Sequence, residues 1–159
     1  DKYFFHKPAA DFTMGLNTTL TYKNWTLAAS GHGSLGNYIY NNVASDGEML
    51  ADLWTNSFTS NRLESALWSN FNQACYLSDY YIKDASFFKV DNVTLGYTFP
   101  SLFKSAKLDR ALGLNIYATV QNVATITNYE GLDPEVFSGI DNNLYPRPRT
   151  YILGVKFNF

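Results

Sequence analysis

The sequence is short of charge and almost lacks cysteine. Only 16% of its 159 residues are charged, with 12 Lys and Arg against 14 Asp and Glu. An average soluble domain carries roughly 25% charged residues, and this near-neutral balance offers no concentrated basic face for nucleic acid. Cys75 is the single cysteine, beside two histidines. An intrachain disulfide is therefore excluded, and a structural zinc site is not expected. No cofactor and no metal-ligating residue is predicted, although the sequence leaves open whether the long loops bind a metal.

A long apolar run is also missing. No stretch of about 18 apolar residues occurs, so the sequence predicts no transmembrane helix. The first residues contain neither an initiator methionine nor a signal-peptide pattern, which suggests an interior start within a longer protein. What the chain has in abundance is apolar material, 46% hydrophobic and 17% aromatic residues. That composition is too apolar for disorder and fits either a soluble β-domain or part of a membrane β-barrel.

Apolar and polar residues alternate with a period of two in five segments, which is the pattern of strands with one apolar face. The predicted strands cover residues 10–22, 25–32, 87–99, 114–121 and 150–159. The first two form a hairpin around a turn at Lys23 and Asn24. Pro100 is expected to end the third, because proline cannot donate to a strand ladder. Two long connections, residues 37–84 and 122–149, separate these strands, and the first has a possible short helix near residues 47–53.

The arrangement of connections and aromatic residues favours a membrane barrel. Long and short connections alternate, as in transmembrane barrels with short periplasmic turns and long extracellular loops. In an antiparallel meander, one end of the sheet would collect aromatic residues in an interfacial girdle, namely Tyr22, Trp25, Tyr97, Phe99, Phe157 and Phe159. The predicted fold is therefore all-β, an antiparallel transmembrane β-barrel fragment with two long extracellular loops. Five strands cannot close such a barrel, which needs about eight.

A soluble, secreted β-sandwich that binds glycans through loop aromatics is the alternative interpretation. It would purify from the aqueous fraction as a folded monomer without detergent. An enzyme is the third possibility, and neither a nucleophile–base pair nor a metal cluster supports it.

Several motifs resemble the SusC/RagA family of TonB-dependent outer-membrane transporters of Bacteroidetes. The most specific is the stretch DASFFKVDNVTLGYTFP over residues 84–100, followed by LNIYATVQNV at 114–123 and TNYEGLDPE at 127–135. The match closes with YPRPRTY at 145–151 and LGVKFNF at 153–159. Order and spacing agree over residues 84–159, and the first hairpin is also similar to its family counterpart. Phe88, Lys89, Asp91 and Phe99 differ from the residues usual in the family.

The resemblance implies a position and a function. Residues 1–159 would be the C-terminal segment of the barrel, about the last five of roughly 22 strands, and not an autonomous domain. The whole protein would import oligosaccharides or peptides across the outer membrane, without catalysis. Its implied partners are a SusD-like surface lipoprotein, the TonB complex acting on the plug, and the remaining plug and barrel strands of the same transporter.

The strand pattern and the resemblance together suggest roles for individual residues. Side chains expected to face lipid are Phe12, Leu16, Leu20, Val93, Leu95, Ile116, Val120, Leu153 and Val155. Those expected to face the lumen or the plug are Asn17, Asn92, Thr94, Asn115, Thr119 and Gln121. Aromatic residues that could contact substrate or lid from the extracellular loops are Trp54, Trp68, Tyr76, Tyr80 and Tyr129. Phe157 and Phe159 would form the C-terminal signal for outer-membrane assembly.

Three further features are interpreted as structural and not as functional. Residues 31–36 match the dinucleotide fingerprint G-x-G-x-x-G, but no helix is expected after them, so a strand bend or a close approach is favoured. His6 and His32 have no carboxylate at catalytic spacing and are interpreted as ordinary polar residues. Arg147 and Arg149 are expected to position backbone next to Pro146 and Pro148.

Overall fold

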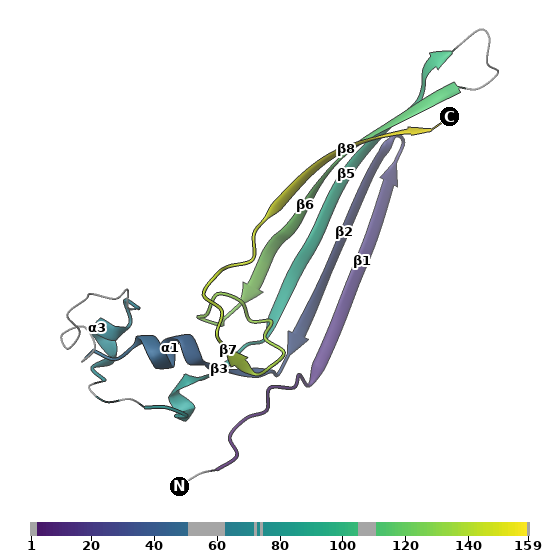
Figure 1. The fold of residues 1–159 in the computed structure, drawn as a ribbon. Coiled ribbons are helices and arrows are strands. Elements are labelled where there is room, and N and C mark those ends of the chain that lie inside the picture. Colours follow the sequence, from purple (N-terminus) through teal and green to yellow (C-terminus); the bar gives the residue numbers. More distant parts are fainter. Residues whose placement is uncertain (1–2, 51–62, 72, 74, 105–110, 159) are drawn as a thin grey trace. The chain divides into compact units, whose positions relative to one another are not determined.

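A computed structural model describes residues 3–50, 63–71, 73, 75–104 and 111–158 (Figure 1). The chain divides into two compact units. The sheet unit comprises residues 13–33, 88–126 and 147–159, and the loop unit comprises residues 1–12, 34–87 and 127–146.

The sheet unit is built on five strands, as the sequence predicts. These are β1 (Phe12–Tyr22), β2 (Trp25–Leu35), β5 (Phe87–Lys104), β6 (Ala111–Thr127) and β8 (Thr150–Asn158). Their order across the sheet is β1-β2-β5-β6-β8 (Figure 1). The hairpin turn lies at Lys23 and Asn24, where Lys23 has a φ of 52°.

Pro100 does not end its strand, contrary to the sequence-based expectation, because β5 continues to Lys104. The amide of Thr98 donates to the carbonyl of Asn24 in the hairpin turn at 2.9 Å. Amides two residues apart point to the same side of a strand. The nitrogen of Pro100 therefore faces the same side as the Thr98 amide, at a position just beyond the end of the hairpin. No ladder bond is lost there, which is how a strand accommodates proline.

Strand β6 is also longer than expected. It ends at Thr127, whereas the sequence predicted an end at Gln121. It pairs with β8 in antiparallel register from Gly113 opposite Asn158 to Gln121 opposite Thr150. Beyond that pairing, Asn122 has a φ of 53° and its side-chain amide donates to the carbonyls of Arg147 and Pro148. The Arg149 guanidinium donates in return to the carbonyls of Asn122 and Val123. Arg149 thus positions backbone, as the sequence suggested.

Tyr117 lies against a glycine of the neighbouring strand. In the register of β6 and β8 it stands opposite Gly154, and a Cβ added to that glycine would meet its ring Cζ at 2.2 Å. On the other side of Tyr117, a Cβ added to Gly96 of β5 would lie 3.7 Å from its Cβ. The tyrosine ring therefore occupies space that only a glycine leaves open at position 154.

The loop unit contains a small sheet of three strands, in the order β4-β3-β7. Strand β3 (Tyr38–Asn41) pairs antiparallel with β4 (Ile82–Asp84) and parallel with β7 (Ile140–Asp141). The parallel pair departs from the all-antiparallel expectation. The core of the loop unit is formed by Ile39, Ala85 and Tyr129, with Val136 packed against them.

The first connection contains a helix, but it ends where the predicted one at residues 47–53 should begin, and residues 48–50 are not helical. Helix α1 spans Asn42–Gly47, since the side-chain oxygen of Asn41 accepts from the amide of Ala44 and caps its first turn. The expected helix at residues 47–53 lies partly outside the described residues. Two short elements follow, α3 (Ala66–Ser69) and the 3-10 helix η1 (Asp79–Tyr81). No helix among the described residues has the length and apolar character to cross a membrane.

Candidate functional site

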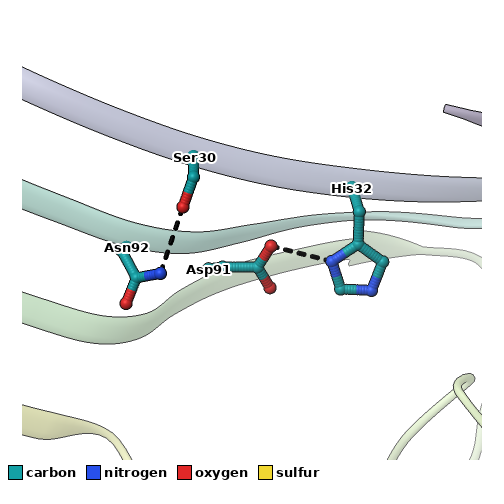
Figure 2. A network of polar contacts seen from close by, with 4 residues as sticks. All are labelled: Ser30, His32, Asp91 and Asn92. Atoms are coloured by element: carbon teal, nitrogen blue, oxygen red, sulfur yellow. Dashed lines mark hydrogen bonds and ion pairs between the residues drawn. The ribbon is translucent and has the colours of Figure 1, made fainter. Parts of the chain in front are cut away.

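One face of the sheet unit carries a series of polar contacts between neighbouring strands. Between β2 and β5, the Asn92 amide donates to the Ser30 hydroxyl at 3.1 Å, and Nδ1 of His32 donates to Asp91 Oδ2 at 2.8 Å (Figure 2). Between β5 and β6, the hydroxyls of Thr94 and Thr119 lie 2.8 Å apart. The Asn115 amide donates to the Thr98 hydroxyl at 2.7 Å. We call this surface the polar face. Its side chains form hydrogen bonds that connect β2, β5 and β6.

The His32–Asp91 contact gives His32 a carboxylate partner that the sequence did not indicate, although His32 remains an ordinary polar residue of the strand. Ser30 and His32 are two residues apart and share a side of β2, whereas Asp91 and Asn92 are neighbours that both reach them (Figure 2). Neighbouring side chains of a regular strand point to opposite faces. Strand β5 therefore breaks its alternation at this pair, as a β-bulge does.

The residues expected to face the lumen are distributed over this polar face. Asn92, Thr94, Asn115 and Thr119 form the cross-strand bonds given above. Asn17 lines a small hollow of about 150 Å³ with Thr19, Ser30, Asn92 and Thr94. Gln121 is exposed at the last residue pair between β6 and β8. The structure thus brings five of the six predicted residues into contacts or a shared hollow.

The opposite face of the sheet unit is apolar and exposed. Side chains of this apolar face include Leu16, Leu20, Leu95, Ile116, Leu153 and Val155. Leu20 is 62% exposed and Leu153 is 78% exposed, so no described segment covers them. A β-sandwich would bury such a face against a second sheet. Strands with one apolar and one polar face have the pattern of transmembrane β-strands.

Aromatic rings gather at the hairpin end of the apolar face, as the sequence suggested. The centroids of Trp25 and Tyr97 lie 4.8 Å apart, and those of Tyr97 and Phe99 lie 4.6 Å apart. Both pairs meet edge to face, the favoured aromatic geometry. Phe157 is exposed opposite Leu114 of β6, and Phe159 lies outside the described residues.

The aromatic residues expected to contact substrate differ in exposure. Trp68 in α3 is 77% exposed and Tyr76 is 60% exposed. Tyr80 in η1 packs edge to face on Phe71 and Tyr81, and the Lys83 ammonium lies 4.8 Å from its ring centroid. Burial, followed by the charge of Glu48, raises the pKa of Tyr81 to about 12. Trp54 lies outside the described residues.

Tyr129 has a structural role that the sequence did not indicate. It is only 6% exposed, and its hydroxyl donates to Asp141 Oδ2 at 2.7 Å. Asp141 is 1% exposed, and its other oxygen accepts from the amide of Asn143. Burial, together with the bond to Asp141, raises the pKa of Tyr129 above its usual range. The Tyr129–Asp141 bond thus joins the core of the loop unit to β7.

Replacing Tyr129 with phenylalanine is expected to destabilise the loop unit by about 1–3 kcal/mol, because the buried Asp141 carboxylate loses a donor. The raised pKa of Tyr129 also sets a pH dependence. Its stabilising contribution is complete below the ordinary tyrosine pKa of 10.0 and declines as the pH rises beyond it. Hydrogen–deuterium exchange of residues 127–146 should therefore accelerate in the variant at pH 7, and above about pH 10 in the wild type. Unchanged exchange in the variant would contradict this role.

Comparison with proteins of known sequence places the chain in a family. It is 43% identical over its whole length to the TonB-dependent receptor SusC of Bacteroides thetaiotaomicron. A TonB-dependent receptor of Formosa agariphila is 28% identical, again along the whole chain. The chain spans only 16% and 17% of the length of these two relatives. Among models of known protein families, none matches the chain.

The fold is that of a solved transporter. In its closed-closed state, the RagAB peptide importer matches 98% of the chain with a TM-score of 0.77 at 21% identity, and the chain covers 18% of it. The open-open state matches with a TM-score of 0.75. The sequence and the fold therefore define a segment of a TonB-dependent transporter. The chain is homologous to SusC and belongs to the SusC/RagA family.

Proposed function

We propose that the chain forms the C-terminal wall of an outer-membrane importer, with its apolar face toward lipid and its polar face toward the lumen. The observation that carries the proposal is the 43% identity to SusC along the whole chain. The two-faced sheet supports it, because lipid requires an apolar exterior while a lumen accepts hydroxyl and amide groups. Phe157 and Phe159 would then serve as the assembly signal.

The two outer strands of the sheet indicate where the rest of the transporter joins. Strands β1 and β8 are the edges of the five-stranded sheet, and an open edge is not tolerated in lipid. We propose that further strands of the same transporter pair with both edges and close a barrel of roughly 22 strands. A plug within that barrel would face the polar face and connect it to the TonB complex.

The loop unit would lie on the extracellular side and contact a SusD-like lipoprotein and the substrate. Trp68 and Tyr76 support this role, since both rings are exposed, and Trp54 and Tyr80 belong to the same connection. Exposed aromatic rings can stack on sugar rings or pack against peptide side chains. The cargo would be oligosaccharides or peptides, moved without making or breaking a bond.

Uptake by cells expressing the whole transporter tests the proposal. We expect a strain that lacks the transporter to lose accumulation of either labelled oligosaccharides or labelled oligopeptides, and the encoded protein to fractionate with the outer membrane. Trp68→Ala should weaken uptake, whereas Tyr151→Phe serves as an aromatic control at an exposed position of the sheet unit. Recovery of the protein from the aqueous fraction as a folded monomer would support the glycan-binding sandwich and contradict the importer.

A further inference from the structure

A groove of about 590 Å³ opens on the apolar face of the sheet unit. Its lining includes Trp25, Leu95, Tyr97, Phe99, Ala118 and Leu153. Ala118 stands opposite Leu153 in the register of β6 and β8, between the larger Ile116 and Val120 on the same face. The small side chain in this row leaves a hollow among bulky neighbours. Its volume is within the range of ligand pockets, about 300–1,000 Å³.

One end of the groove is held in place by the hairpin turn. The Asn24 side-chain amide donates to the Tyr97 hydroxyl at 3.5 Å, and the Asn24 carbonyl accepts from the amide of Thr98 at 2.9 Å. These bonds fix the turn next to the aromatic rings of Trp25, Tyr97 and Phe99. Rings with a polar tip favour the boundary between hydrocarbon and headgroups.

Lys23 places a positive charge at the same end. Its ammonium lies 5.4 Å from the centroid of the Tyr22 ring, and Tyr22 alternates along β1 onto the apolar face with Leu16 and Leu20. The ammonium therefore lies beside a ring of the apolar face, two residues before Trp25. A lysine at a membrane surface attracts anionic headgroups by about 1 kcal/mol.

We propose that the groove retains one anionic phospholipid, with an acyl chain along the groove and its phosphate beside Lys23. This inference rests on the proposed function, because it requires the apolar face to lie in a bilayer. The apolar lining suits the hydrocarbon chain, and the cation at the aromatic end suits the phosphate. Lipid bound in this way would be retained selectively, unlike the lipid that surrounds any barrel.

Native mass spectrometry of the whole transporter, purified from outer membranes, tests the proposal with phosphatidylglycerol and phosphatidylcholine as probes. Ala118→Leu narrows the groove at its smallest lining residue and should lower retention of phosphatidylglycerol about tenfold. Leu16→Phe adds volume to the same face on β1, away from the groove lining, and should leave retention unchanged. Lys23→Gln should reduce the preference for phosphatidylglycerol over phosphatidylcholine about fivefold, whereas Lys23→Arg should preserve it.

Two results would overturn the phospholipid site. One is wild-type retention in Ala118→Leu, and the other is an unchanged lipid preference in Lys23→Gln. Because Lys23 lies in an exposed turn, its two variants decide the question even where Ala118→Leu impairs assembly. Either result in a protein that still fractionates with the outer membrane leaves the importer proposal intact. A protein that is soluble without membranes would contradict both.

Discussion

Replacing Leu153 with arginine is expected to destabilise the transporter by about 2–4 kcal/mol, the cost of arginine on the lipid face at the bilayer midplane. Leu153 is 78% exposed on the apolar face and stands opposite Ala118. If that face meets lipid, the guanidinium loses its water without gaining a partner. Chemical unfolding of the transporter in phospholipid vesicles measures the loss directly. The folded fraction in the outer membrane should fall in parallel.

Ile152 provides a matched control one residue away. It stands opposite Thr119 and therefore belongs to the polar face, so Ile152→Arg would place the same charge toward water or the plug. This variant should assemble with nearly the stability of the wild type. Equal losses for the two variants would contradict the assignment of faces, and a greater loss for Ile152→Arg would reverse it.

Gly154→Ala is expected to destabilise the sheet unit by about 1–3 kcal/mol, because the new methyl group must displace a packed ring. Its Cβ would lie 2.2 Å from Cζ and 2.4 Å from the hydroxyl oxygen of Tyr117. The tyrosine ring has to swing away from β8 and loses its contact with the glycine. The temperature above which the transporter no longer migrates as the folded form on electrophoresis should therefore fall.

Tyr117 and Gly96 supply the controls for this prediction. In a Tyr117→Ala background, Gly154→Ala should have little further effect, since the obstructing ring is gone, and a double-mutant cycle measures that coupling. Gly96 flanks the same tyrosine on β5, but an added Cβ there meets its neighbours at 3.7 Å or more. Gly96→Ala should therefore be much milder. Additive losses for Tyr117→Ala and Gly154→Ala would show that the ring is not the obstacle.

The alternation of side chains predicted the strands of the sheet unit and their two faces. Leu16, Leu20 and Leu153 are exposed on one face, while Thr94 and Thr119 meet on the other. Such prediction succeeds because a strand exposes successive residues to opposite environments, and each environment accepts only one kind of side chain.

The break in β5 was missed, although the sequence contains a signal for it. Apolar residues occupy Phe88 and Val90 and then shift to Val93 and Leu95, so the alternation changes phase between them. That phase change coincides with Asp91 and Asn92, the neighbours that both bond to β2. The partner of Asp91 is 59 residues earlier in the chain, and no local pattern could identify it.

The partners within the loop unit could not be predicted from local sequence either. Residues 1–12, 34–87 and 127–146 come together there, and β3 pairs with β4 on one side and β7 on the other. The sequence predicted the two long segments as loops, with a possible short helix near residues 47–53 in the first. Tyr129 was expected to contact substrate, but its buried bond to Asp141 depends on that distant pairing.

The sequence by itself determined the five main strands, the two chemically distinct faces of their sheet and the resemblance to the SusC/RagA family. These properties depend on residue alternation and on motifs read along the chain. Only the tertiary structure decided that β5 continues past Pro100, that His32 pairs with Asp91 and that Ala118 leaves a groove between larger side chains. The reason is physical: a missing ladder bond, a cross-strand pair and a hollow all depend on what the neighbouring strand supplies.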